Sequence, residues 1–292
     1  MGHHHLVVPL LSYHTRTTVE TIEMNEFEGQ VAFISGAGSG IGRGMAEAFV
    51  AAGMKVVLGD VDGESARQVA ADLTAQGGET LPLDLDVADR TSWDAAAQQA
   101  EAAYGPIDIL CNNAGVAGLS RPVEDIPIEE WKWMTDINFY GVVHGLQCFI
   151  PRLKAKGAGH IVNTSSIGGM VPLPKFSEYM AAKYAVVGLS GAVRQELKPF
   201  GISVSVLCPG AVRTSLGETT VRQRPGRANL AAARGEVVGQ QEWRYIEPIK
   251  VGRIVLRGMA EEWAFIFTHP ENRAEVETQF DAMRAAFDAL PD

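Results

Sequence analysis

Tyr179 and Lys183 stand four residues apart in SEYMAAKYAV, residues 177–186, a segment otherwise rich in small or apolar side chains. In a helix this spacing is about one turn, so both side chains project from the same face toward one small volume. A free phenol has a pKa of about 10, too high for an efficient base at neutral pH, and a nearby positive charge favours the phenolate. The pair can therefore take a proton from a substrate hydroxyl, although Tyr and Lys also fall at this spacing by chance, in helices where they only pack.

Composition and charge exclude several classes of protein. The 292 residues are 46% hydrophobic, enough for a substantial core, and the formal net charge of -10 disfavours a nucleic-acid partner. No apolar run approaches the roughly 18 residues that span a bilayer. Three scattered cysteines in apolar segments suit buried thiols in a reducing compartment, so we expect a cytoplasmic protein. These are Cys111, Cys148 and Cys208, and the histidines His144, His160 and His269 show no ligand spacing that would support a metal site.

The first 23 residues differ from the rest of the chain. They contain His3, His4 and His5 and only a brief apolar stretch without a basic start, which makes a poor secretory signal. We expect residues 1–23 to be a tag or an extension outside the fold. No repeat and no Pro/Ser-rich linker divides residues 24–292, which we interpret as one domain.

Short runs rich in β-formers alternate with longer amphipathic ones along this domain. Apolar runs without alternation indicate strands covered on both faces, which is typical of a parallel sheet with helices above and below. The pattern predicts an α/β protein with a Rossmann-type, doubly wound sheet. The expected strands are residues 31–35, 55–60, 80–84, 107–113, 160–166, 203–210 and 264–268, and the expected helices include residues 41–52, 64–76, 93–104, a long segment from Ile128 and the segment that contains Tyr179.

Residues with chemical potential follow these strands, where ligands bind in such sheets. SGAGSGIG, residues 35–42, follows the first strand, and its glycines allow a tight turn that brings backbone amides and a helix N-terminus against a pyrophosphate. Asp60 ends the second strand, where a carboxylate can accept hydrogen bonds from ribose hydroxyls and repels a 2′-phosphate. No Arg or Lys adjoins Asp60 in the sequence, so NAD is favoured over NADP. Asp86 and Val87 follow the third strand and could contact the adenine, or form an ordinary turn.

The order of the motifs carries a resemblance. The glycine turn, NNAG at 112–115, TSS at 164–166, Y-x-x-x-K and PG at 209–210 together resemble the short-chain dehydrogenase/reductase family, over roughly residues 28–214. The resemblance implies Tyr179 as the base, Lys183 as the group that lowers its pKa and holds the nicotinamide ribose, and Ser166 as the hydrogen-bond partner of the substrate oxygen. It also implies that Asn138 positions a water that leads protons from Lys183 to solvent, against the alternative of a merely satisfied helix residue.

The sequence pattern and the family resemblance together predict an NAD site. They indicate an NAD-dependent oxidoreductase that acts on a secondary alcohol or ketone. Ser35 replaces the threonine usual in the family and keeps its hydroxyl, and Asn112 is expected to be structural. The expected cofactor-binding residues are Gly36, Ser39, Gly40, Ile41, Gly42, Asp60, Asp86, Val87, Asn113, Ala114, Gly115, Tyr179, Lys183, Pro209, Gly210, Val212 and Thr214.

The sequence indicates less about the substrate than about the cofactor. Met170, Leu173 and Phe176 lie between Ser166 and Tyr179 and suggest an apolar wall. The stretch at about 211–246 is placed where this family carries its substrate lid, and its length suggests a bulky molecule. The C-terminal part loosely resembles a branch with dehydrogenases of bulky aromatic secondary alcohols. The lid arginines Arg213, Arg222, Arg224 and Arg227 are interpreted as facing water, with contact to a substrate carboxylate as the alternative.

Two other functional classes stay open, together with the state of assembly. The chain could be an NAD-binding regulatory protein without turnover, or a sugar-nucleotide epimerase or dehydratase, which shares the Y-x-x-x-K helix. The apolar segment at 131–150 and the resemblance favour a homotetramer or homodimer, with core packing of that segment as the simpler explanation.

Overall fold

A single parallel sheet organises the molecule. The computed structural model describes residues 24–224 and 244–291. Its described strands follow the order β3-β2-β1-β4-β5-β6-β7, all in parallel pairs, so the chain starts in the middle and winds outward in both directions. The strands are β1 (Val31–Ser35), β2 (Lys55–Asp60), β3 (Glu79–Asp84), β4 (Ile109–Asn112), β5 (Gly159–Thr164), β6 (Ile202–Cys208) and β7 (Phe265–Phe267).

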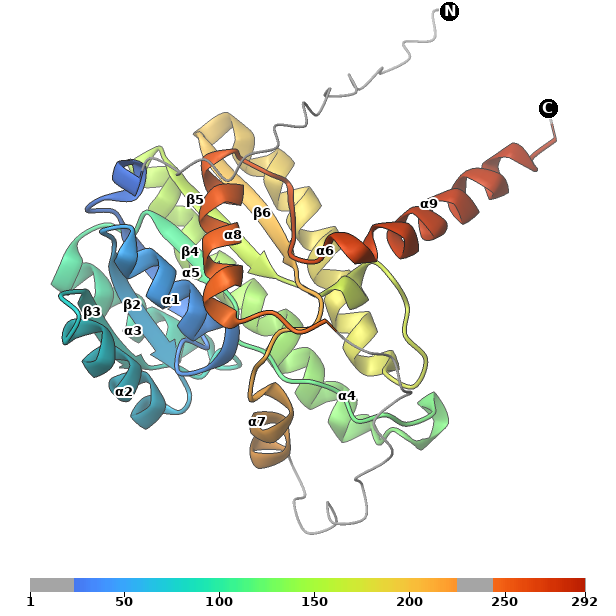
Figure 1. The fold of residues 1–292 in the computed structure, drawn as a ribbon, viewed down its shortest axis with the longest axis horizontal. Coiled ribbons are helices and arrows are strands. Elements are labelled where there is room, and N and C mark those ends of the chain that lie inside the picture. Colours follow the sequence, from blue (N-terminus) through green and yellow to red (C-terminus); the bar gives the residue numbers. More distant parts are fainter. Residues whose placement is uncertain (1–23, 225–243, 292) are drawn as a thin grey trace, which may run out of the picture.

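Helices cover both faces of the sheet (Figure 1). Helices α1, α2 and α8 pack on one face and α3, α5 and α6 on the other, each with its own apolar cluster. The predicted doubly wound α/β fold is therefore confirmed. The helices are α1 (Gly40–Ala51), α2 (Gly63–Thr74), α3 (Arg90–Tyr104), α4 (Ile128–Thr135), α5 (Gly141–Lys156), α6 (Ser177–Leu197), α7 (Leu216–Gln223), α8 (Pro248–Ala260) and α9 (Arg273–Asp288).

The segment after β4 is more complex than the long helix expected from Ile128. Helix α4 passes into a π-helical turn, Asp136–Tyr140, and then into α5. Val142, Leu146 and Phe149 of α5 are buried in the core against α3 and the sheet. This packing accounts for the apolar inner face of α5 without a second subunit, and the expected oligomer stays a prediction.

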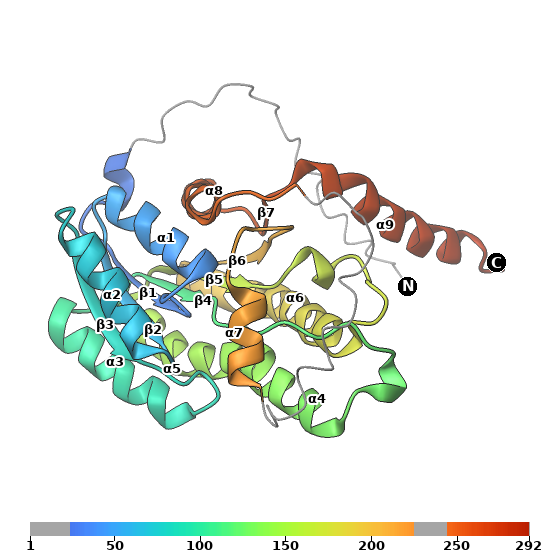
Figure 2. The ribbon, with the colours of Figure 1, turned by 60° about the horizontal axis from the view of Figure 1, so that its bottom comes forward.

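Helix α9 has no counterpart in the expected elements. It projects from the body of the domain (Figures 1 and 2) and none of its residues is buried. The three cysteines are all buried, as expected. Across residues 24–224 and 244–291, we find no helix whose length and hydropathy would let it cross a bilayer. Nor do His, Cys, Asp and Glu side chains form a group of three that could hold a metal ion in those ranges. The expected tail at 1–23 lies outside the described residues.

Candidate functional site

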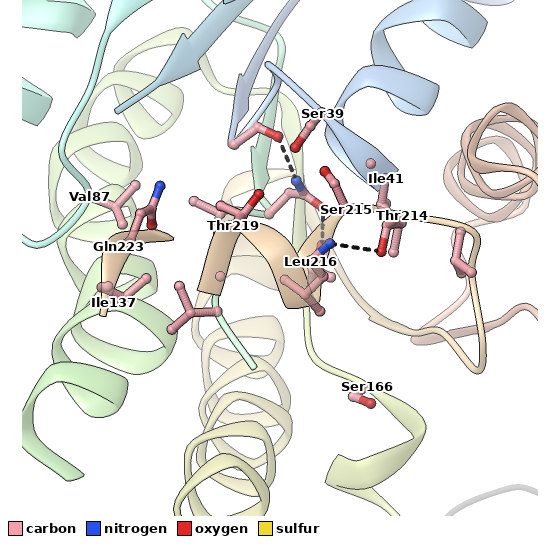
Figure 3. Close-up of a pocket in the computed structure, with 18 of the residues that line it drawn as sticks. Ser39, Ile41, Val87, Ile137, Ser166, Thr214, Ser215, Leu216, Thr219 and Gln223 are labelled. Carbon is pink, nitrogen blue, oxygen red and sulfur yellow. Dashed lines mark hydrogen bonds between the residues drawn. The ribbon is translucent and has the colours of Figure 1, made fainter. Parts of the chain in front are cut away.

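A cavity of about 920 Å³ opens at the carboxyl ends of the strands. It is lined by the turns after β1 to β6 and by α7, and Figure 3 shows part of it. Most residues predicted from the sequence meet there. They are Gly36, Ser39, Gly40, Ile41, Asp60, Asp86, Val87, Asn113, Ala114, Gly115, Ser166, Leu173, Tyr179, Lys183, Pro209, Gly210, Val212 and Thr214.

Four predicted residues do not line this cavity. Gly42 lies beneath the glycine turn, where an added Cβ would collide with the carbonyl of Gly36. Met170 packs against the core on the α5 side, which leaves Leu173 as the predicted apolar residue that reaches the cavity. The other two are Asn138 and Phe176.

The glycine turn after β1 fits closely against the NNAG segment. Gly36 has a φ of +67°, and a Cβ there would come within 2.7 Å of the Ala114 Cα, so only glycine suits this position. The Ser35 hydroxyl accepts hydrogen bonds from the backbone N–H groups of Asn113, at 2.9 Å, and Ala114, at 3.1 Å. The hydroxyl retained at Ser35 therefore joins the two loops that form the floor of the cavity.

Asp60 is held by backbone donors at the end of β2. Its two carboxylate oxygens accept hydrogen bonds from the N–H groups of Gly38, at 2.8 Å, and Asp62, at 2.9 Å. Burial raises the pKa of Asp60, and these two hydrogen bonds oppose that effect. Asp62, not Asp60, caps α2, because its side chain accepts from the Ser65 N–H. The Asp60 carboxylate therefore does not cap α2.

A cation does reach the neighbourhood of Asp60, although none adjoins it in sequence. Arg222 of α7 forms an ion pair with Asp62 at 3.1 Å, and its charge lowers the pKa of Asp60 slightly against burial. Arg222 and Asp60 both line the cavity. A positive charge therefore lies near Asp60 in space, brought there by a segment about 160 residues away in the sequence.

Tyr179 and Lys183 lie as the helical spacing predicts. Both are on α6, and the Lys183 Nζ is 5.6 Å from the centroid of the Tyr179 ring. The ammonium donates a hydrogen bond to the carbonyl of Thr164, at 3.1 Å, which places it at the end of β5. Burial lowers the pKa of Lys183 to about 8. At pH 7 Lys183 is therefore still mostly protonated and can favour a phenolate beside it.

The pKa of Tyr179 differs from the sequence expectation. Burial raises this pKa above the ordinary value, and a hydrogen bond from the Ser166 side chain lowers it in part. The expectation that Lys183 would set a low pKa neglected desolvation, which disfavours the charged form of both groups. Ser166 thus has an electrostatic contact with the phenol in addition to its place on the cavity wall.

Asn138 is fully buried in the π-helical turn. Its side chain pairs with both backbone groups of Val116: Oδ1 accepts from the N–H and Nδ2 donates to the carbonyl, each at 2.8 Å. A Cβ on Gly115 would lie 2.9 Å from Asn138 Oδ1 and 3.5 Å from Lys183 Nζ. Asn138 therefore fixes the loop after β4 beside Lys183. Single π turns inside helices frequently mark functional sites.

Helix α7 supplies cavity residues that the sequence did not single out. Leu216, Thr219 and Gln223 line the cavity together with Ser39 and Ile41 (Figure 3). The sequence placed a lid at about 211–246, and this was its only signal for these side chains. Residues 225–243, with Arg227, lie outside the described part of the chain.

The lid arginines are not all solvated. Arg213 is exposed and pairs with Glu247 at 2.8 Å, in line with the expectation. Arg224 contradicts it, because its side chain is only 4% exposed and forms an ion pair with Glu130. A charged group at the end of a surface helix was buried by packing that the sequence does not reveal.

Comparisons with known proteins agree with this geometry. The family model described as short chain dehydrogenase matches residues 30–225. The chain is 32% identical over 269 residues to the C alpha-dehydrogenase of Sphingobium sp., which covers 89% of this chain and 87% of that protein. It is 35% identical over 198 residues to the cyclohexanol dehydrogenase of Acinetobacter sp., which covers 68% and 79% of the two chains.

A solved structure shares the fold over nearly the whole chain. The short-chain dehydrogenase/reductase from Burkholderia phymatum in complex with NAD has a TM-score of 0.80 and 33% identity, and the match covers 89% of this chain and 96% of that one. Together with the sheet order and the cavity, these matches show that the chain belongs to the short-chain dehydrogenase/reductase family of oxidoreductases.

Proposed function

We propose that this protein is an NAD-dependent dehydrogenase that interconverts a secondary alcohol and a ketone, with Tyr179, Ser166 and Lys183 as catalytic residues. The observation that carries the proposal is the meeting of these three side chains with the glycine turn and Asp60 in one cavity. Its volume lies at the upper end of the range of about 300–1,000 Å³ for small-molecule sites.

The residues present fit NAD. The backbone of the glycine turn and the N-terminus of α1 form a cradle suited to a pyrophosphate. Asp60 offers a carboxylate to the ribose hydroxyls, and the relative from Burkholderia phymatum binds NAD. NAD, when bound, supplies the acceptor for the hydride. Asp86, Val87, Pro209, Gly210, Val212 and Thr214 line the same cavity and complete the proposed cofactor site.

The chain's own residues move the proton. During alcohol oxidation the Tyr179 Oη takes the hydroxyl proton while the hydride leaves the carbinol carbon, and ketone reduction reverses both transfers. The Ser166 Oγ donates to the same substrate oxygen and stabilises the charge that develops on it. Lys183 keeps a positive charge beside the phenol at neutral pH. Asn138 holds the loop that borders Lys183 and would position a water for proton exit.

The substrate is proposed to be bulky and apolar or aromatic. Leu173, Trp133, Ile137 and Leu216 add apolar surface to the cavity, and Trp133 and Ile137 belong to the same apolar cluster as Tyr179. Two relatives are named as dehydrogenases of a Cα position and of cyclohexanol, which supports a secondary alcohol as the substrate class.

A substrate screen tests the proposal. The protein is incubated with NAD or NADP and a panel of cyclic, aryl and aliphatic secondary alcohols, and nicotinamide absorbance is followed. We expect reduction of NAD with aryl or cyclic members. Cofactor binding without any hydride transfer would instead favour a regulatory protein, and retained NAD without net reduction would favour an epimerase or dehydratase.

A further inference from the structure

The C-terminal end of α7 is tied to the body of the domain by a partly buried charge cluster, which we call the Glu130 cluster. Its members are Arg121, Glu130 and Arg224. Glu130 on α4 forms ion pairs with Arg224 at the end of α7 and with Arg121 in the loop after β4. The side chains of Arg224 and Glu130 are only 4% and 15% exposed. One carboxylate thus joins two arginines from separate segments.

Burying these charges costs free energy, so a gain in stability does not by itself explain the cluster. Removing ions from water costs several kcal/mol each, and a buried ion pair is weak evidence for net stabilisation. Burial also lowers the pKa of Arg224 to about 10, which shows how strongly its surroundings disfavour the charge. An apolar contact would hold a helix end with less desolvation. A charged contact instead fixes one geometry and one partner.

Helix α7 needs such external contacts. It has eight residues, and isolated helices shorter than about 12 residues are unstable in water. Its middle is held by Thr220, whose hydroxyl accepts a hydrogen bond from the Ala117 N–H at 2.8 Å. Arg222 pairs with Asp62 through side chains that are 57% and 29% exposed, so this contact is partly screened by solvent. The Glu130 cluster is the most buried ionic attachment among the described residues of α7.

The inner face of α7 forms part of the cavity. Leu216, Thr219 and Gln223 line it together with Val87 and Ile137 (Figure 3). Arg224 directly follows Gln223, so any shift of Arg224 displaces the end of this wall. The ion pair with Glu130 on α4 is therefore one of the contacts that fix where the end of α7 lies.

We propose that Glu130 and Arg224 are positioning residues that hold α7 as a wall of the cavity and so set the affinity for substrate and cofactor. The inference rests on the proposed dehydrogenase function. Neither residue lines the cavity that contains Tyr179, so the chemical step itself does not depend on them. Their loss should raise KM and leave kcat at saturation nearly unchanged.

The cluster also neighbours the catalytic helix. Glu178, which precedes Tyr179, is buried, and burial raises its pKa, while the charge of Arg121 opposes that effect in part. A test must therefore separate an effect on α7 from a general disturbance of α6. Arg224→Gln is the cleaner variant, because it leaves Glu130 paired with Arg121. Glu130→Gln leaves the buried Arg224 and the partly buried Arg121 without their carboxylate and is the more severe variant.

The experiment combines kinetics and hydrogen exchange on Arg224→Gln, Glu130→Gln and the control Glu247→Gln. Glu247 pairs with Arg213 at the surface, at 62% and 68% exposure, and its loss should change little. For Arg224→Gln we expect KM for the alcohol and Kd for NADH to rise at least about tenfold, with kcat within about threefold of the parent. Exchange of the amides of residues 216–223 should accelerate at least about tenfold, while those of α6 stay protected.

The kinetic and the exchange measurements can each contradict the inference without contradicting the proposed function. If the parent turns over an alcohol and Arg224→Gln keeps the parent's KM, or if exchange in α7 is unchanged, Arg224 does not position this helix. Equal acceleration in α6 and α7, with kcat lowered, would assign the cluster a general structural role instead. The exchange measurement needs no turnover, so it decides the question even if the parent reduces no cofactor. If Glu130→Gln does not fold, Arg224→Gln and Arg224→Lys, which should recover part of the affinity, carry the test.

Discussion

The ammonium of Lys183 lies 5.6 Å from the centre of the Tyr179 ring, one helical turn along α6. Burial acts on both groups, because it raises the pKa of the phenol and lowers that of the amine to about 8. Free Tyr and Lys have similar pKa values, so the two shifts move the pKa of Lys183 below that of Tyr179. The positive charge that favours the phenolate is therefore present up to a pH of about 8 and lost above it.

Tyr179→Phe should abolish most turnover. The phenol is the proposed proton acceptor, and general base catalysis contributes about 10²–10⁴-fold, so kcat for alcohol oxidation should fall by that amount. Affinity for NADH, measured by fluorescence titration, should change little. Tyr184→Phe is the matched control, because Tyr184 lies five residues further on and is 39% exposed. If Tyr179→Phe keeps most of the parent's activity, the proposed mechanism is wrong.

Ser166→Ala should lower kcat and move the pH profile to higher pH. The Ser166 side chain lowers the pKa of Tyr179, so its loss lets that pKa rise further. The phenolate then forms at higher pH, and the midpoint of alcohol oxidation increases. The control is Ser165→Ala, because the Ser165 hydroxyl donates to the Lys183 carbonyl at 2.8 Å. A profile that shifts for Ser165→Ala and not for Ser166→Ala would reverse the assignment.

Lys183→Met should weaken cofactor binding as well as catalysis. The variant loses a group placed to hold the nicotinamide ribose and a positive charge beside the phenol, so Kd for NADH should rise and the oxidation midpoint should move upward. In the parent, this charge is present below a pH of about 8 and lost above it. The effect of the substitution should therefore be largest below pH 8. Equal losses at pH 6 and pH 10 would speak against an electrostatic role.

A dimer or tetramer is expected in solution. Phe280, Met283 and Phe287 on α9 are 44%, 56% and 75% exposed, and Phe265 and Phe267 on β7 are exposed as well. Large exposed apolar patches are rare on monomers, so these surfaces are expected to be covered by other copies of the chain. Sedimentation velocity at micromolar concentration checks this, and a single monomeric species would contradict it.

The strands and the residues that follow them could be predicted from the sequence, because apolar runs mark the strands and ligands bind at their carboxyl ends. Two kinds of feature could not be predicted from the sequence. The contributions of Leu216 and Gln223 depend on how α7 folds back over the cavity, which no local pattern encodes. The buried Arg224 and the raised pKa of Tyr179 both follow from desolvation, which depends on tertiary packing.

Asp60→Ala should relax the preference for NAD, and Arg222 should determine by how much. Asp60 repels a 2′-phosphate, so the parent should use NAD with higher kcat/KM than NADP. Without that carboxylate, Arg222 of the same cavity becomes available to a phosphate, although it still pairs with Asp62. We expect the ratio of kcat/KM for NADP over NAD to rise at least about tenfold, equivalent to about 1.4 kcal/mol.

In the double variant Asp60→Ala/Arg222→Ala much of this gain should disappear. Steady-state kinetics with both cofactors on these three proteins test the prediction. Equal use of NAD and NADP by the parent would remove Asp60 from its assigned role, and an undiminished gain in the double variant would exclude Arg222.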